Sequence, residues 1–385
     1  MAVTPVPNKA EYWANMAMAG GWLDTWFAAN LISNPPYGGD PALTNQYYDG
    51  QLCAYYLKDH FGGTTYDTLI ENERKAYVDY YVNDPAVHGG VAGYRNFTEG
   101  MLQDVLRSTA HSASSLAALN SILTDGTYVD HGDVTDQSLS RECAYAIMAY
   151  INAKRAGITL TSGQQTRLAS LVNSALGHIT SWVNETAEFY RPFMGSITAH
   201  ALIHYLTYYG DDARFLPAIE SLATYTWTLW KSTTGSWGQA NSFLYTNKVG
   251  VDGVDWWAST DDANTAPDLN MMIAPTFGWL FWKTGVQDWR DKGDLIFSGS
   301  ISVYNDGFYD HGAYLGYDGN PSGKQINQQL VWGPLYIQWA EMDPGTPPTP
   351  DPTPPTPTPT ATFIIKAGTK GKFTVTKNGI KFTIS

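Results

Sequence analysis

The chain has 385 residues, of which 43% are hydrophobic, and it carries a formal net charge of −13. This length and apolar content suffice for one large buried core. No run of about 18 apolar residues, the length that spans a membrane, occurs. An acidic body also disfavours nucleic acid as a partner, because phosphate binding needs a basic face. We therefore expect neither a membrane span nor a nucleic-acid partner.

Helix hairpins recur along the chain. Each has an aromatic-rich helical stretch, a short turn containing glycine, and a second amphipathic helix, and glycine just past a helix favours a left-handed C-terminal cap. The predicted helices, in chain order, are 10–30, 47–61, 65–82, 98–123 (one broken helix or a pair), 137–156, 163–183, 198–209, 214–230, 275–283, 288–298 and 328–341.

The hairpins favour a closed ring over an open solenoid. A hairpin cannot bury its apolar face alone, so repeated hairpins must stack or close. The connections vary from a few residues to more than about twenty, whereas solenoid arrays repeat at a fixed period. We predict an all-α toroid over residues 1–342, with its long connections on one face.

A different composition begins at Asp343. Residues 343–361 form a Pro/Thr-rich linker that favours extended polyproline II. Residues 362–385 alternate apolar and polar side chains around Asn378-Gly379, which predicts a β-hairpin turning at that dipeptide. We expect a small β module on a tether that docks to a surface or another protein; the alternative is an incidental extension.

Cys53 and Cys143 each lie among apolar residues of a predicted helix. Two isolated cysteines have no metal-ligand spacing, so we expect buried free thiols.

Aromatic residues make up 14% of the chain, and many lie in the long connections. Flat rings beside polar and acidic groups suit sugars, whose C–H faces stack on aromatics while their hydroxyls accept and donate hydrogen bonds. The simpler alternative is that these rings close the ends of the toroid. We predict a polysaccharide or oligosaccharide substrate.

Carboxylates gather in connections that precede helices, and in a toroid these connections converge at one mouth. Cleaving a glycosidic bond needs one protonated and one ionised carboxyl group. The favoured catalytic pair is Asp136 and Asp268, with Asp49 and Glu142 next. The candidate substrate-binding residues are Trp256, Trp257, Tyr190 and Tyr314 for stacking, and Arg141 and Arg191 for hydroxyls or a carboxylate.

Other chemistries lack their signatures. The chain has no G-x-S-x-G elbow, H-E-x-x-H zinc motif or P-loop. We expect no cofactor and no catalytic metal. The alternative for Asp130, Asp133 and Asp136 is a structural Ca²⁺, although their spacing does not match an EF-hand.

Three stretches resemble a known group of enzymes: Tyr47–Gly50 opening a helix, Met194–Leu202 before the Gly210-Asp211 turn, and Asp268–Pro275 before Lys283-Thr284-Gly285. They resemble the helix punctuation of (α/α)6-toroid carbohydrate-active enzymes, such as unsaturated glucuronyl hydrolases and alginate-lyase-like toroids. The resemblance covers roughly residues 45–340. It implies an (α/α)6 toroid and a saccharide substrate, and paired aspartates in the hydrolases imply Asp49, Asp136 and Asp268 as candidates.

The leading hypothesis is a glycoside hydrolase, extracellular or virion-associated. A polysaccharide lyase is the first alternative, because His111, His200, or Tyr190 with Arg191 or Lys324, would provide a base and a cation for elimination at a uronate. A non-catalytic carbohydrate-binding or adhesin protein is the second.

Overall fold

The computed structural model describes residues 3–30, 48–83, 93–108, 110–124, 136–232, 241–248, 265–301, 304–305, 310–311, 323–346, 371–376 and 379–384. Within them lie twelve α-helices and three two-stranded sheets.

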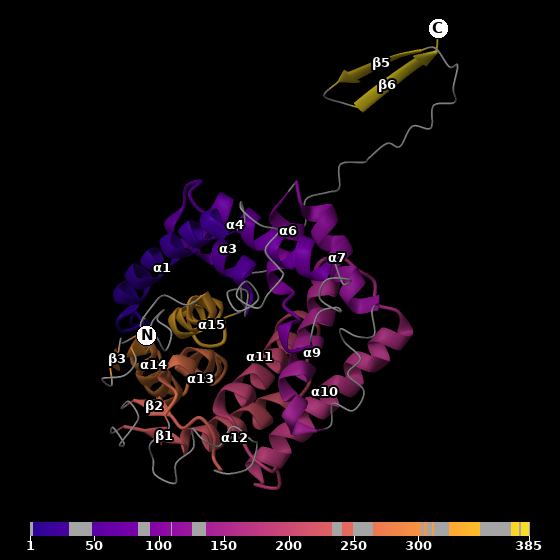
Figure 1. Ribbon diagram of the computed structural model, residues 1–385. Coiled ribbons are helices and arrows are strands. Elements are labelled where there is room, and N and C mark those ends of the chain that lie inside the picture. Colours follow the sequence, from indigo (N-terminus) through magenta and orange to yellow (C-terminus); the bar gives the residue numbers. More distant parts are fainter. Residues whose placement is uncertain are drawn as a thin grey trace.

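Six helices form the closed inner ring seen in Figure 1. Each contacts the next in chain order and the last contacts the first, so the ring has no free edge. The inner helices are α3 (Gly50–Phe61), α6 (Glu99–Arg107), α9 (Ser140–Arg155), α11 (Pro192–Tyr208), α13 (Asn270–Thr284) and α15 (Gly323–Glu341).

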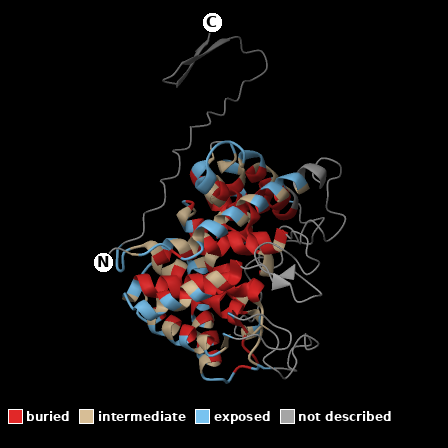
Figure 2. Ribbon diagram, turned by 90° about the vertical axis from the view of Figure 1, so that its left-hand side faces the viewer, coloured by how far each residue is buried: buried red, intermediate tan, exposed pale blue. Residues whose placement is uncertain are grey.

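Six further helices surround this ring, each packed on one or two inner helices. They are α1 (Lys9–Asn30), α4 (Asp67–Arg74), α7 (Ser112–Thr124), α10 (Ser162–Val183), α12 (Phe215–Trp227) and α14 (Gln287–Ile301). Buried residues concentrate in the inner ring and exposed residues on the outer helices (Figure 2). The predicted (α/α)6 toroid is thus confirmed.

Local chemistry sets the helix ends. The Asp49 carboxylate caps α3, and Thr161 with Gln164 forms a capping box at α10. Gly285 ends α13 in the left-handed conformation that glycine adopts most easily. α11, α13 and α15 begin five or six residues before their predicted starts: Pro192 occupies the first turn of α11, while Pro275 and Pro334 lie inside α13 and α15.

Four short helical segments adjoin the inner and outer helices. The π-helix η1 (Lys75–Val82) continues α4, and 3₁₀ turns precede three inner helices: η2 (Gly93–Arg95), η3 (Gln137–Leu139) and η5 (Pro267–Leu269). The predicted stretch 98–123 is a pair, α6 and α7, rather than one helix.

The amino-terminal segment closes the ring by tying α1 to α15. Lys9 Nζ lies 2.7 Å from the Glu341 carboxylate, and the backbone N–H of Val6 donates to the same group at 2.9 Å. The buried Tyr12 hydroxyl donates to the carbonyl of Gln329 at 3.0 Å. These contacts join the two ends of the helical body.

The strands are short. β1 (Trp230–Lys231) pairs with β2 (Ser242–Phe243), and β3 (Tyr304–Asn305) with β4 (Asp310–His311), both antiparallel. β5 (Gly371–Thr376) and β6 (Gly379–Ile384) form the predicted carboxy-terminal hairpin. Thr376 pairs with Gly379, so Gly379 lies in a strand and not in the turn that the Asn378-Gly379 dipeptide predicted.

Cys53 and Cys143 are buried free thiols, as expected. No helix within the described ranges is long and apolar enough to cross a membrane.

Candidate active site

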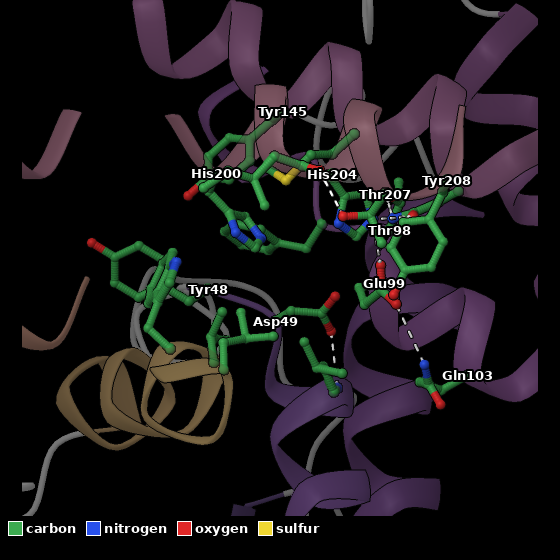
Figure 3. Close-up of a pocket in the computed structure, with 18 of the residues that line it drawn as sticks. Tyr48, Asp49, Thr98, Glu99, Gln103, Tyr145, His200, His204, Thr207 and Tyr208 are labelled. Carbon is green, nitrogen blue, oxygen red and sulfur yellow. Dashed lines mark hydrogen bonds and ion pairs between the residues drawn. The ribbon is translucent and has the colours of Figure 1, made fainter. Parts of the chain in front are cut away.

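A cavity of about 170 Å³ lies among the inner helices, and Figure 3 shows residues that line it. Five of the six inner helices contribute to its wall, together with the residues just before α3 and α6. Polar lining residues include Asp49, Asn96, Thr98, Glu99, Gln103, Asn152, Arg155, His200, His204 and Thr207; aromatic ones are Tyr48, Tyr56, Phe97, Tyr145, Tyr208, Trp332 and Trp339.

Asp49 lies at the wall of this cavity with only 8% of its surface exposed. Its carboxylate accepts the backbone N–H of Leu52 at 3.0 Å and that of Gly100 at 2.7 Å. Burial, with a smaller contribution from the nearby Glu99 charge, outweighs the lowering effect of these hydrogen bonds and raises the pKa of Asp49 to about 6. Asp49 therefore changes charge near the pH at which enzymes work.

Glu99 lines the same cavity, and its pKa is shifted in the opposite direction. Its carboxylate lies 2.8 Å from Arg155 Nη1 and 3.2 Å from His204 Nε2. Burial alone raises the pKa of Glu99, but Arg155 and His204 outweigh it and hold this pKa well below its usual range. Two neighbouring carboxyl groups with pKa values pushed apart are a common arrangement for an acid and an anionic partner.

A polar network fixes the position of Glu99. The Asn152 amide donates to the Thr98 hydroxyl at 2.9 Å and accepts from Arg155 at 2.9 Å. His204 Nε2 lies 3.0 Å from the Asn152 amide oxygen and 2.9 Å from Arg155 Nη1, so the imidazole is part of the same network. The Arg155 guanidinium also stacks on Tyr208 at 3.7 Å from the ring centroid.

His200 lies one helical turn before His204, with their ring centroids 5.6 Å apart. Burial, together with the His204 charge, lowers the pKa of His200 to about 3. The imidazole is therefore neutral at physiological pH, and it lines the cavity.

The candidates in the connections lie outside this cavity, apart from Asp49. Asp136 is exposed and caps η3, accepting the backbone N–H of Ser138 at 2.8 Å. Asp268 is 9% exposed and accepts from Gln325 Nε2 at 3.1 Å. Glu142 lies in the first turn of α9, 3.3 Å from Arg141. Their catalytic roles stay predictions.

The substrate-binding candidates divide into three groups. Arg141 lies in the first turn of α9, Arg191 directly precedes α11, and both are partly exposed. Tyr190 is a core residue, 1% exposed and in contact with Trp182 and Tyr225, so stacking on a sugar would require its ring to leave the core. The third group, Trp256, Trp257 and Tyr314, lies outside the described residues.

Two further expectations concern metal and lyase chemistry. Asp130 and Asp133 lie outside the described residues; within the described ones, no group of three or more His, Cys, Asp or Glu could hold a metal ion. His111, a candidate base, has its Nε2 2.9 Å from the Glu71 carboxylate and does not line the cavity, whereas His200 does.

Glu99, Asn152, Arg155 and His204 are cavity residues that we did not predict from the sequence. They lie within helices, where polar residues usually belong to a solvent-exposed face. The available signal was the spacing of His200 and His204, which puts two polar residues on one face of an otherwise apolar helix, α11.

The closed (α/α)6 ring thus encloses a cavity with polar and aromatic walls. Among solved structures, the chain is similar to cellobiose 2-epimerase from Bacillus thermoamylovorans, with a TM-score of 0.52 and 10% sequence identity over 78% of this chain and 88% of the epimerase. At this identity the similarity concerns the fold. No family model and no curated protein matches the sequence.

Proposed function

We propose that the protein hydrolyses a glycosidic bond of a saccharide bound in the axial cavity. The observation that supports this most strongly is the pair Asp49 and Glu99. Glycoside hydrolysis needs one carboxyl group that is protonated and a second that is ionised. The raised pKa of Asp49 and the lowered pKa of Glu99 give that combination at mildly acidic pH.

Asp49 is the general acid in this proposal. With a pKa of about 6 it retains its proton at mildly acidic pH and can transfer it to the leaving glycosidic oxygen. The two backbone N–H groups hold the carboxyl group in place, so little reorganisation precedes the transfer.

Glu99 supplies the negative charge beside the oxocarbenium-like transition state. Water adds to the anomeric carbon as the bond to the leaving oxygen breaks, and the proton that the water loses restores Asp49. Arg155 and His204 keep it ionised. The rings of Tyr48, Phe97 and Trp332 provide apolar surface for the C–H faces of the sugar.

The test is reducing-end release from a panel of polysaccharides and oligosaccharides. Asp49→Asn should lower turnover by about a hundredfold or more, the low end of what a positioned acid contributes. Nuclear magnetic resonance of the first product anomer would show whether configuration is retained or inverted. An unchanged turnover in Asp49→Asn would refute the role of this residue.

Sugar epimerisation is a second candidate, favoured by the neutral His200 in the cavity and by the similarity to an epimerase. Epimerisation changes the configuration of a free sugar without releasing new reducing ends, and it exchanges the transferred proton with solvent. Deuterium incorporation from D₂O without chain shortening would therefore favour this candidate. Ultraviolet absorbance of a conjugated product would instead indicate elimination, the reaction of a lyase.

A further inference from the structure

Four aromatic side chains form a continuous layer at one end of the cavity. The ring of Tyr48 meets that of Trp332 edge to face, with centroids 4.9 Å apart, and lies 6.2 Å from that of Phe97. Phe97 in turn meets the ring of Tyr145 at 5.4 Å. All four residues line the cavity, and none is more than 5% exposed. We call these four residues the aromatic layer.

The aromatic layer reaches across the interior of the ring. Trp332 belongs to α15 and Tyr145 to α9, whereas Tyr48 and Phe97 lie in the segments that lead into α3 and α6. The Tyr48 hydroxyl also donates to Sδ of Met272, on α13, at 3.5 Å. The layer therefore connects five of the six inner helices and closes this end of the cavity.

The backbone of Tyr48 holds its ring in the layer. Its φ angle is 65°, in the left-handed region that a bulky side chain rarely adopts. The N–H of Gly50 donates to the Tyr48 carbonyl at 3.0 Å across this tight turn. Such conformations persist where the surroundings over-determine them, and they cluster at binding sites. The Tyr48 ring is thus a fixed part of the closed end.

The opposite end of the cavity is open to solvent. Four lining residues lie within about one turn of the carboxyl end of their helices: Gln103 of α6, Thr207 and Tyr208 of α11, and Gln338 of α15. Gln338 is exposed and the other three are half-buried. In Figure 3, Tyr48 and Tyr145 lie at the left of the cavity, on the side away from Tyr208. Among the residues that the structure describes, the cavity is therefore closed at one end and open at the other.

The size of the cavity suits one sugar ring. Its volume is about 170 Å³, close to the roughly 150 Å³ of a cavity that holds benzene and below the roughly 300–1,000 Å³ of pockets for larger ligands. From Trp332 to Gln338 the wall extends about 9 Å along α15. One pyranose unit fits this space, and a second unit would lie at the entrance.

The proposed acid lies between the closed end and the entrance. Asp49 directly follows Tyr48, and its carboxylate is held by the N–H of Gly100 in the first turn of α6. Gln103, at the entrance, lies one turn further along α6, with its Nε2 3.4 Å from Glu99 Oε1. The bond that joins an enclosed sugar unit to the rest of its chain would therefore lie near Asp49.

We propose that the cavity is a blind pocket for one terminal sugar unit, so that the protein removes single units from a chain end. This proposal rests on the proposed function, since it names the part of the saccharide that is cleaved. An internal unit carries chain on both sides, and the aromatic layer leaves no exit for the second side. Each turnover adds one water across the terminal bond and yields one monosaccharide and a chain shortened by one unit.

The test is the size of the first products. The full-length protein is incubated with oligomers of glucose, mannose, galactose and xylose of two to six units, and the products are separated by chromatography. The first products should be the monosaccharide and the oligomer shortened by one unit. A hexamer that yields two trimers would overturn this proposal alone, because reducing ends would still be released.

Binding tests the pocket without catalysis. Calorimetry with the full-length Asp49→Asn variant compares oligomers of one to six units. Units beyond the second should each change affinity by less than about threefold, because they lie in solvent and gain few contacts. Affinity that rises steadily with every unit would indicate an open groove and overturn the proposal. If no oligomer were bound or cleaved, this proposal and the proposed function would both fail.

A variant at the entrance then locates the opening. Gln338→Trp narrows the entrance at an exposed position, so it should lower kcat/KM for oligomers by about tenfold or more without lowering the melting temperature. The matched control is Ser170→Trp, on the exposed face of α10, which should keep wild-type kcat/KM. Wild-type kcat/KM in Gln338→Trp would mean that the chain enters elsewhere and would overturn the proposal.

Discussion

The Asp49 carboxylate accepts the backbone N–H of Gly100 at 2.7 Å and so links α3 to its neighbour in the inner ring, α6. The contact serves two purposes. It satisfies an N–H group in the first turn of α6, and it holds Asp49 at the cavity wall, where burial raises its pKa to about 6. The hydrogen bond that joins two inner helices thus also holds the proposed acid in its buried position.

The first prediction is the pH dependence of cleavage. Because Asp49 must be protonated to act as the acid, kcat/KM should fall as pH rises through about 6. Asp49→Asn should remove this limb of the profile. The matched comparison is Asp136→Asn, because Asp136 is an exposed capping residue. If Asp136→Asn lost turnover while Asp49→Asn kept wild-type turnover, the catalytic residues would lie in the connections and not in the cavity.

The second prediction concerns Gly100. A Cβ at this position would lie 2.8 Å from Gln51 Cβ and 2.9 Å from the backbone nitrogen of Leu52, and closer still to the Asp49 carboxylate. Gly100→Ala should therefore destabilise the fold by about 1–3 kcal/mol and displace Asp49, lowering kcat.

The control for Gly100 is Gly177, which lies on the exposed face of α10 with open space around it. Gly177→Ala should stabilise the protein by about 0.5–1 kcal/mol, because alanine loses less backbone entropy in a helix. Urea unfolding measures both variants. Equal effects would show that the Gly100 contact is not tight.

The third prediction concerns Arg155. Its side chain is 6% exposed and pairs with Glu99, so Arg155→Met should leave a buried carboxylate without its main counter-charge and cost about 3–5 kcal/mol at neutral pH. The folded pKa of Glu99 lies below its ordinary 4.5, so this stabilisation is present above that value and is lost as pH falls below it.

Arg107→Met is the control for Arg155, because Arg107 pairs with Asp59 at the surface, where ion pairs contribute about 0–1 kcal/mol. Chemical denaturation at pH 7 and at pH 3.5 should show that the difference in free energy of unfolding between the two variants is smaller in acid. An equal difference at both pH values would mean that the effect of Arg155→Met does not depend on the charge of Glu99.

The fourth prediction separates packing from binding at Tyr190. Its hydroxyl lies 2.5 Å from Thr226 Oγ1 inside the core. Tyr190→Phe should lower stability by about 1 kcal/mol, the contribution of one buried hydrogen bond, and leave KM unchanged. A raised KM at unchanged stability would support the predicted stacking role instead.

The fifth prediction concerns where the helical body ends. The backbone N–H of Gly345 donates to the Trp282 carbonyl, and Trp282 Nε1 donates to the Thr346 carbonyl, both at 2.8 Å. Truncation after Thr346 should leave the melting temperature unchanged. Truncation after Met342 should cost about 1–2 kcal/mol, because both hydrogen bonds are lost; identical melting of the two truncated proteins would contradict this.

The sequence alone determined the helix hairpins, their closure into a toroid and the carboxy-terminal β-hairpin. These follow from periodicity, glycine caps and connection lengths, which are local properties of the chain. Asp49 was also recognisable, because an aspartate before a helix is a common cap. The sequence did not predict that α11, α13 and α15 begin five or six residues before the expected positions. Packing in the inner ring stabilises their first turns, whose local signals are weak.

Only the tertiary structure decided which polar residues share the cavity. Glu99 and Arg155 are 56 residues apart, and each reads as an ordinary polar position of its own helix. Their pairing depends on the register of neighbouring inner helices, which side-chain packing sets and sequence spacing does not reveal. The protonation states of Asp49 and Glu99 likewise arise from burial and neighbouring charges, which exist only once the ring has closed.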